Sequence, residues 1–443
     1  MYGLTRQELR FALVLSSSHF AQHVYFRIIP PLIPILAVAL AYPLWQLGLL
    51  ISIYSVGMGI GQAPLGVLSD RVDRLYLLPT GLIVTGAAYV AFAFAPSIGR
   101  PVPAVTLFGS TFGGEFLVMS LAMAVVGFGL AVVHPVGYPM ISDNVADANK
   151  GKVLGVFGAA SKFGDAATPA AIAVLILVMD WQPLIVLFGL GGMAYGGALY
   201  LVLRRDEFET RPSGQRSDTP ESGSASSVMD DHRTFLYPMV IMFFFFTFSI
   251  LTSRVITTFL PAFIVAVYPF SLDIIGIHVG PESIANVYFA VILIAGGVMQ
   301  LYLGYAADHY DARSVLVGCM ALATVGMIAL AMFDLHPAVL AIVVIVLGTG
   351  LFGVNPARDA LISDISPPEF EGRTFGYIWT AATLVGAIFP TVIGYVLEIL
   401  GMRAGFLVFT SGTVAAALCV GLLYSDRFYV SHPQAEKPVD ASD

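Results

Sequence analysis

Ionisable side chains stand inside segments of this chain that are otherwise apolar enough to enter a lipid bilayer. His19, His23 and Arg27 follow one another at intervals of four residues, which places them on one face of a helix. A charge at the centre of a membrane costs about 2.5–3.5 kcal/mol on insertion scales, so it persists where it faces a water-filled cavity or a partner. The stripe therefore predicts the cavity side of a membrane-spanning helix.

A second arginine, Arg254, lies in a similar apolar segment 227 residues after Arg27. Guanidinium groups bind the oxygen atoms of carboxylates and phosphates in pairs. If both arginines face one cavity, they form a site for a small organic anion. The alternative is that Arg27 extends to the outer membrane surface, because it lies 17 residues after Arg10, or about 25 Å along a helix. We favour the cavity, since apolar sequence continues beyond both arginines.

His134 and Asn355 each precede a proline in an apolar segment, and a proline leaves a carbonyl of the preceding turn without its helical partner. Both positions suit contact with a substrate. His134 and His19 are also candidates for proton exchange near neutral pH. The alternative for His134 is a buried histidine with a purely structural role.

Lys162 and Asp165 stand three residues apart in another apolar segment. They either neutralise each other or take part in a proton relay. Arg358, which is followed by Asp359, either belongs to a gate on the cytoplasmic side or extends its charge to the membrane surface.

The elements that must position these residues are membrane-spanning helices. Of the 443 residues, 57% are hydrophobic and 11% are charged, whereas a soluble domain carries about 25% charged residues. A spanning helix needs roughly 20 apolar residues. No sheet is expected, because lipid-facing backbone must be satisfied within helices or closed barrels and the apolar runs are too long for barrel strands. The first run is also too long for a cleavable signal peptide. Twelve spans are predicted near residues 11–40, 44–68, 77–95, 116–142, 153–179, 183–203, 235–266, 283–306, 314–332, 338–362, 373–397 and 405–424.

The positive charges predict the orientation, because cytoplasmic loops carry an excess of Lys and Arg. With the N-terminus inside, Arg100 and Arg403 fall outside, and Arg27, Lys162, Arg254 and Arg358 fall within the spans. Both termini are therefore expected in the cytoplasm of a cell-membrane protein. The fifteen cytoplasmic residues are Arg6, Arg10, Arg71, Arg74, Lys150, Lys152, Arg204, Arg205, Arg211, Arg216, Arg233, Arg313, Arg373, Arg427 and Lys437.

The two halves of the chain share an internal duplication. "HPVGYPMISDN" at 134–144 matches "NPARDALISDI" at 355–365, and "GVLSDRVDR" at 66–74 matches "GYAADHYDA" at 304–312. The number of residues that separates matching positions of the two halves changes along the chain. Long external loops between spans three and four and between spans seven and eight explain this change. Residues 204–234 are rich in Ser, Pro and charge and predict a flexible linker. The expected domains are bundles at 1–203 and 235–425, the linker at 204–234 and a cytoplasmic tail at 426–443.

The pattern G-x-x-x-D-R-x-D-R at residues 66–74 resembles the signature loop of the major facilitator superfamily, although Asp73 stands where that family usually has glycine. The resemblance covers roughly residues 10–425. It implies an all-α membrane protein with two pseudo-symmetric six-helix bundles, in which spans one, four, seven and ten line the central path.

The same resemblance implies gating residues at the cytoplasmic ends of the helices, ordinary loop charge being the alternative. Gly66 is expected to permit close helix contact, Asp70 to face the start of span eleven, and Asp143 to pair with an arginine after Asp70. The predicted set is Gly66, Asp70, Arg71, Arg74 and Asp143, with Gly304, Asp308, Arg313 and Asp364 as the counterparts.

Within the superfamily, "SSHFAQH" and "VVHP" are similar to motifs of fosmidomycin-resistance-type exporters, although Gln22-His23 replaces the expected Asn-Asp. Lys162 and Asp165 replace small or uncharged residues of those exporters. The paired arginines Arg27 and Arg254 are similar to those of the organophosphate:phosphate antiporters.

These features together predict a secondary active transporter that moves a small organic anion by alternating access, with proton coupling. Drug or antimetabolite efflux by proton antiport is one alternative, and a transporter-like receptor that does not translocate is another. No nucleotide motif or Cys/His metal spacing occurs, and Cys319 and Cys419 suit apolar packing. We therefore expect no enzymatic activity, cofactor, metal or nucleic-acid partner, and a monomer surrounded by lipid.

Overall fold

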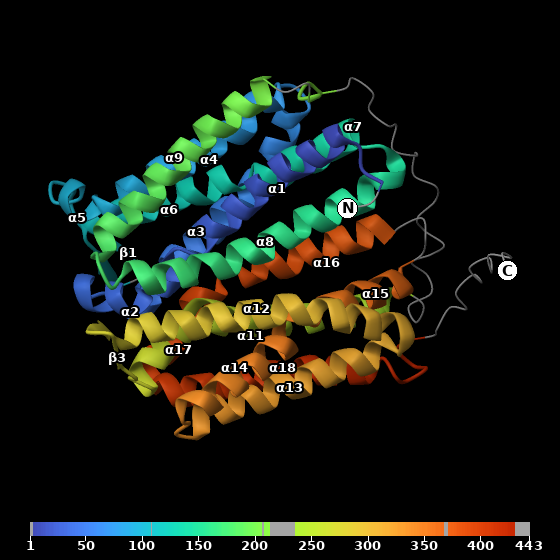
Figure 1. Cartoon of the computed structure of the whole chain (residues 1–443). Coiled ribbons are helices and arrows are strands. Elements are labelled where there is room, and N and C mark those ends of the chain that lie inside the picture. The colour runs from blue at the N-terminus through green and yellow to red at the C-terminus, as the bar shows by residue number, and fades with distance from the viewer. Residues whose placement is uncertain (1–2, 108, 206–207, 213–234, 367–370, 430–443) are drawn as a thin grey trace, which may run out of the picture. The chain divides into compact units, whose positions relative to one another are not determined.

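The computed structural model describes residues 3–107, 109–205, 208–212, 235–366 and 371–429, and helices dominate it (Figure 1). The first half of the chain contributes α1 (Arg6–Phe26), α2 (Ile29–Leu40), α3 (Leu44–Ser69), α4 (Arg74–Ala93), α5 (Ala95–Ile98), α6 (Gly114–Leu130), α7 (Val133–Asn144), α8 (Asp147–Leu175) and α9 (Trp181–Arg205). The second half contributes α11 (Tyr237–Val267), α12 (Pro281–His309), α13 (Ala312–Met332), α14 (Pro337–Phe352), α15 (Asn355–Ile365), α16 (Glu371–Gly386), α17 (Phe389–Leu400) and α18 (Met402–Leu422).

Each of the twelve predicted spans corresponds to one helix or to two consecutive helices. In the described part of the chain, eleven spans are long and apolar enough to cross a membrane. The twelfth, α8, is not among them, because Lys162 and Asp165 lower its hydropathy and further charges stand in its first two turns. The span that fails this criterion is thus one of those that carry candidate functional residues.

Prolines divide three spans that carry candidate residues into two helices each. Pro30 and Pro31 occupy the first turn of α2, and the chain leaves α1 at Arg27, whose φ of −106° and ψ of 8° are not helical. α6 and α7 meet just before Pro135, and α14 and α15 meet just before Pro356. Because proline cannot donate a backbone hydrogen bond, each break leaves carbonyl groups near its candidate residue without helical partners.

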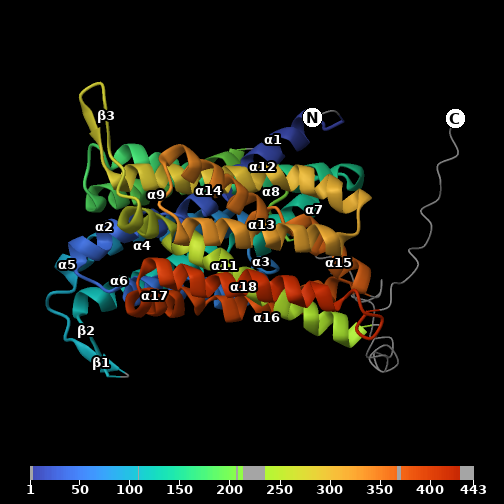
Figure 2. The same cartoon turned by 90° about the horizontal axis from the view of Figure 1, so that it is seen from below.

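Two short β-hairpins correct the expectation that the chain contains no sheet. β1 (Val105–Leu107) pairs antiparallel with β2 (Ser110–Phe112), and β3 (Leu272–Ile274) pairs with β4 (Ile277–Val279). The turns contain Gly109 and Gly276, whose φ angles of +79° and +78° favour glycine. Both hairpins lie in the long loops that the duplication marked as insertions, and Figure 2 shows them projecting beyond the helix ends.

By its contacts the chain divides into two compact units. Unit 1 contains Met1–Arg216, Thr257–Ile294 and Ala387–Met402, and unit 2 contains Ser217–Ile256, Ala295–Gly386 and Arg403–Asp443. Unit 1 therefore includes α17 and parts of α11 and α12 in addition to the first six spans. The domain boundaries expected from the duplication, at 203 and 235, remain a prediction.

Glycines allow close helix packing in unit 1, most clearly between α4 and α9, which run side by side (Figure 1). A Cβ on Gly86 would stand 2.4 Å from the carbonyl oxygen of Gly189, and a Cβ on Gly189 would stand 2.7 Å from that of Gly86. No side chain fits at these distances, so the backbones of the two helices touch.

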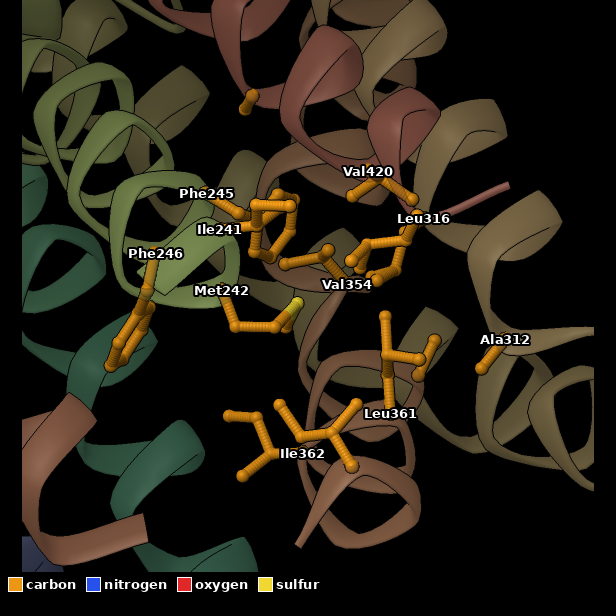
Figure 3. Close-up of a cluster of buried hydrophobic side chains, with 14 of the residues drawn as sticks. Ile241, Met242, Phe245, Phe246, Ala312, Leu316, Val354, Leu361, Ile362 and Val420 are labelled. Atoms are coloured by element: carbon orange, nitrogen blue, oxygen red, sulfur yellow. The ribbon is translucent and has the colours of Figure 1, made fainter. Parts of the chain in front are cut away.

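The core of unit 2 is a cluster of buried aliphatic and aromatic side chains (Figure 3). Met242 and Phe245 of α11 meet Leu316 of α13, Leu361 of α15 and Val420 of α18. Since one cluster joins these helices, they pack as one body.

Candidate functional site

Arg27 and Asp165 form a buried ion pair in unit 1. The Nε of Arg27 donates a hydrogen bond of 2.7 Å to Oδ1 of Asp165, and the two residues are 8% and 5% exposed. Nδ1 of His23 lies 3.1 Å from the same oxygen, which is an ion-pairing distance when His23 is protonated, although the N–H is not aligned for a hydrogen bond. One carboxylate oxygen therefore faces both cationic candidates of the α1 stripe.

The close approach of α8 to α1 places Asp165 at this position. Gly164 precedes Asp165, and a Cβ on it would stand 2.4 Å from the carbonyl oxygen of Phe20. One turn later, Oγ1 of Thr168 donates to the carbonyl oxygen of Val24 at 3.0 Å. A glycine and a hydroxyl thus hold the two backbones together, so that the short aspartate side chain reaches the end of α1.

Three histidine rings meet beside the ion pair. The centroid of the His19 ring lies 4.9 Å from that of His23 and 5.1 Å from that of His134. His19 also stacks on Phe157 of α8, and its Nδ1 lies 2.7 Å from the carbonyl oxygen of Phe157. The structure therefore brings together three histidines from two spans.

Gln22 belongs to the same cluster, although it was not predicted as a site residue. It is 2% exposed, and its Nε2 donates to the carbonyl oxygen of Leu130, the last residue of α6, at 2.7 Å. Its position next to His23 in an apolar span is the signal that could have identified it.

The candidates of the second half lie in unit 2. Arg254 is half-buried on α11, and because Arg27 belongs to unit 1, the approach of the two arginines remains a prediction.

Arg358 is 6% exposed, which excludes extension of its charge to the membrane surface in this structure. Its Nη1 donates to Oδ1 of Asn355 at 2.9 Å and its Nε to Asp359 at 2.8 Å. Asn355 thus contacts a buried cation.

Aromatic rings complete the surroundings of Arg358. Its guanidinium carbon lies 4.5 Å from the centroid of Phe246 and 5.2 Å from that of Trp379. Cation–π contacts of this kind hold a guanidinium group among apolar helices. Phe246 is therefore a partner of a charged residue.

The predicted pairing of Asp143, at the end of α7, with an arginine after Asp70 is present in unit 1, and we call this ion pair the latch. Nη1 of Arg74 donates to Oδ2 of Asp143 at 2.5 Å, and Arg74 is 4% exposed. Of the two arginines predicted as partners, Arg74 takes this role, while Arg71 is exposed, as is Asp70. The expected contact of Asp70 with the start of span eleven is untested, because the side chains at 371–373 lie outside the described residues.

A short segment after α9 forms hydrogen bonds with Asn144 and with the backbone of Arg74, on both sides of this ion pair. Asn144 bonds the backbone of Glu209 twice, donating to its oxygen at 2.8 Å and accepting from its nitrogen at 2.7 Å. The carbonyl oxygen of Thr210 accepts from the nitrogen of Arg74 at 3.0 Å, and Phe208 packs edge-on against Phe11. We call residues 208–211 the strap. The strap lies within residues 204–234, which were predicted to form a flexible linker throughout.

The counterpart latch of the second half differs from the prediction. Nε of Arg313 bonds Oδ1 of Asp311 at 3.0 Å, and its Nη1 donates to the carbonyl oxygen of Leu423. The expected partners were Asp308, which is exposed, and Asp364. Although partial burial alone would raise it, the hydrogen bonds and charge of Arg313 hold the pKa of Asp311 below its usual range. Asp311 caps α13 as Asp73 caps α4, so the duplication extends to the caps.

The signature glycines are less crowded than expected. A Cβ on Gly66 would lie 3.8 Å from Cβ of Pro135, and one on Gly304 would lie 3.6 Å from Cβ of Pro356. Both are ordinary van der Waals distances, so the prediction that a side chain at Gly66 would hold the helices apart is wrong for a methyl group in this structure. The two glycines face equivalent prolines, which again follows the duplication.

Comparison with known proteins decides the family. A model of the Major Facilitator Superfamily matches residues 15–293 and 277–442. The chain belongs to the Major Facilitator Superfamily. It is therefore a multi-pass membrane transporter of a class that carries small molecules and is not enzymatic.

The relatives agree with this assignment. The "Inner membrane transport protein YajR" of Escherichia coli (strain K12) is 26% identical over 401 residues, which are 89% of this chain and 78% of that protein. The "Probable L-galactonate transporter" of the same organism is 27% identical over 162 residues, so the match covers 37% of this chain and about a third (32%) of that protein.

Solved structures show the same fold. A D-xylose-proton symporter has a TM-score of 0.73 at 14% identity, with 96% of this chain and 98% of that chain covered. A bacterial homolog of the human lysosomal transporter Spinster has a TM-score of 0.72 at 13% identity, with 96% and 99% covered. At such identities the likeness concerns the fold alone.

Proposed function

We propose that this transporter carries a small organic anion across the cell membrane by alternating access and couples the movement to protons. The observation that carries the proposal is the cluster of Arg27, Asp165 and the histidines of α1 and α7. Its residues offer charge for an anion and groups that exchange protons.

The charges of the cluster favour an anion. Arg27 and Lys162 contribute two positive charges and Asp165 contributes one negative charge, so the cluster carries one surplus positive charge while its histidines are neutral. Protonation of any histidine increases that surplus. Within an apolar bundle this charge is compensated most directly by a negatively charged ligand.

The geometry of Arg27 supports the same conclusion. Among the described residues, its contact with Asp165 uses Nε, and its two Nη atoms make no hydrogen bond. The paired Nη groups match the spacing of two carboxylate or phosphate oxygens. Arg27 can therefore keep its partner on α8 and bind a ligand anion on its other edge. The predicted approach of Arg254 would complete such a site.

The residues around Asp165 support proton coupling. Protonation of His23 would place a second cation 3.1 Å from Oδ1 of Asp165, in competition with Arg27. His19, His134 and Lys162 line the same cluster, so proton binding and anion binding would act on one carboxylate.

The name of one relative also supports an anionic substrate. That relative is the "Probable L-galactonate transporter", and L-galactonate is an organic anion.

Transport in proteoliposomes tests the proposal. We expect labelled carboxylates or organophosphates to accumulate under an imposed pH gradient and to exchange in counterflow. Arg27→Gln should reduce accumulation by about tenfold or more, because loss of one charge-assisted pair costs at least ~1.4 kcal/mol. Arg254→Gln should have a similar effect. Arg100→Gln, which removes an exposed arginine, is the matched control.

The double variant Arg27→Gln/Asp165→Asn separates binding from folding, since it removes both members of the buried ion pair together. We expect it to fold and still fail to transport anions. Intact anion transport by Arg27→Gln and by Arg254→Gln would refute the anion proposal. Proton-driven exchange of cationic drugs would favour efflux instead, and binding without counterflow would indicate a receptor.

A further inference from the structure

Buried polar atoms without partners gather on one stretch of α1. The three consecutive serines of this helix differ: Oγ of Ser17 donates to Val14 and Oγ of Ser18 to Leu15, at 2.7 and 2.6 Å, in the manner usual for serine in a helix. Oγ of Ser16, in a residue 5% exposed, has no hydrogen-bond partner among the described residues. A buried hydroxyl in this condition is destabilising unless a further molecule bonds it.

His19 carries the second such atom, and its tautomer can be deduced. A carbonyl oxygen only accepts, so the 2.7 Å contact with Phe157 requires that Nδ1 of His19 holds the proton. In the neutral ring Nε2 is then an unprotonated acceptor. It is buried and has no partner among the described residues.

Gln22 carries the third buried polar atom without a partner. Its Nε2 donates to Leu130, which leaves Oε1 as a buried acceptor that no described residue bonds. Residues three apart on a helix are neighbours on its surface, so Ser16, His19 and Gln22 form a continuous row. The row ends beside His23, which contacts Asp165.

We propose that the Ser16–His23 stretch of α1 binds a chain of ordered water molecules that conducts protons to and from Asp165. The inference rests on the proposed proton coupling. Water supplies the donors that two facing acceptors lack, and buried waters bond about three polar groups each. A divalent cation is a poor occupant, because no group of three metal-binding side chains occurs among the described residues.

The proton transfers balance along this row. A hydronium ion in the row gives a proton to Nε2 of His19 and becomes water, and the ring becomes an imidazolium while Nδ1 keeps its bond to Phe157. The imidazolium then returns a proton through Nε2 to the next water, which passes one to Nδ1 of His23 or to a carboxylate oxygen of Asp165. Other ionisable groups lie near the row: His134 of α7 contacts His19, Tyr138 of α7 contacts His134, Tyr195 of α9 contacts Ser17, and Arg27 and Lys162 act on Asp165.

Cysteine reactivity tests the hydration directly, without reference to transport. In a Cys319→Ala/Cys419→Ala background, Ser16→Cys and Ser18→Cys are compared for reaction with a small thiosulfonate, which is attacked by ionised thiols in contact with water and releases a sulfinate. We expect Ser16→Cys to react about tenfold faster or more, since a thiolate forms where water solvates it. Equal rates would show that the row is dry and overturn the inference.

Transport separates this inference from the proposed function. Ser16→Ala and Gln22→Met should keep substrate counterflow, which needs no net proton movement, and lose about tenfold of the accumulation driven by a pH gradient. Ser18→Ala, whose hydroxyl is already bonded, is the matched control and should keep both. Unchanged accumulation in Ser16→Ala and Gln22→Met would refute the water chain. If the unaltered protein shows no proton-driven accumulation, the proposed coupling fails, whatever the cysteine rates.

Discussion

At the scale of single residues, the arginine of the first span is held by a partner that sequence spacing did not identify. Asp165 stands three residues after Lys162, so the sequence suggested that these two either neutralise each other or form a relay. In the structure the carboxylate forms its hydrogen bond with Arg27 of another helix. Which residues of two helices meet depends on their relative rotation and translation, and one sequence contains no measure of either.

A double-mutant cycle measures this ion pair. Arg27→Gln and Asp165→Asn should each destabilise the protein by about 3–5 kcal/mol, because each leaves the other charge buried without its partner. The double variant should lose much less than the sum of the two. Thermal unfolding in detergent gives the comparison, and additive losses would show that the two side chains do not interact.

Gly164 allows a sharper test of how α8 meets α1. Gly164→Val should lower the melting temperature and impair transport, because its Cβ would clash with the carbonyl oxygen of Phe20, and overpacking costs about 1–3 kcal/mol or more. Gly158→Val, on the same helix with open space around its Cβ, is the control. Equal stability of the two variants would contradict the close contact.

At the scale of elements, the apolar runs and the positions of the prolines predicted the helices and most of their breaks. Twelve apolar runs became twelve spans, and the prolines after His134 and Asn355 mark real breaks. The break at Arg27 was missed, although Pro30 and Pro31 signal it. The hairpins were missed because their loops were treated as insertions, while "VTL" and "STF" around a glycine is a hairpin pattern.

The strap makes a prediction of its own. Asn144→Leu should release residues 208–211, because it removes both hydrogen bonds to the backbone of Glu209. The readout is maleimide labelling of Thr210→Cys, a position 8% exposed, in the cysteine-free background, relative to denatured protein. We expect labelling to rise about tenfold, the effect of ~1.4 kcal/mol on an opening equilibrium.

Arg211→Ala provides the strap's control, since the exposed Arg211 meets Asp73 at 3.7 Å, and such pairs contribute little. It should leave labelling of Thr210→Cys nearly unchanged. If Asn144→Leu labels no faster than Arg211→Ala, the strap is not held by Asn144.

At the scale of the whole molecule, unit 1 joins helices from both halves of the sequence. Gly48 of α3 and Gly394 of α17 both lie where a Cβ would overlap the opposite backbone, at 2.1 Å from Pro390 and 2.5 Å from Leu44. Oγ of Ser52 lies 2.8 Å from Oγ1 of Thr391. Alternating access would require this contact to open in each cycle.

A disulfide at this contact tests that requirement. Ser52→Cys/Thr391→Cys in the cysteine-free background should cross-link under mild oxidation, and the oxidised protein should lose transport, which a reductant should restore. Each single-cysteine variant is a control for oxidation itself. Transport at the original rate by fully cross-linked protein would show that α3 and α17 need not separate.

The charge content of α8 has a consequence for biosynthesis. Lys and Asp at the centre of a helix each cost about 2.5–3.5 kcal/mol when a segment partitions alone from the translocon into lipid, and α8 carries Lys162 and Asp165. Arg27, synthesised more than a hundred residues earlier, supplies the compensating charge. We therefore expect stable insertion of the fifth span to await its docking on the first.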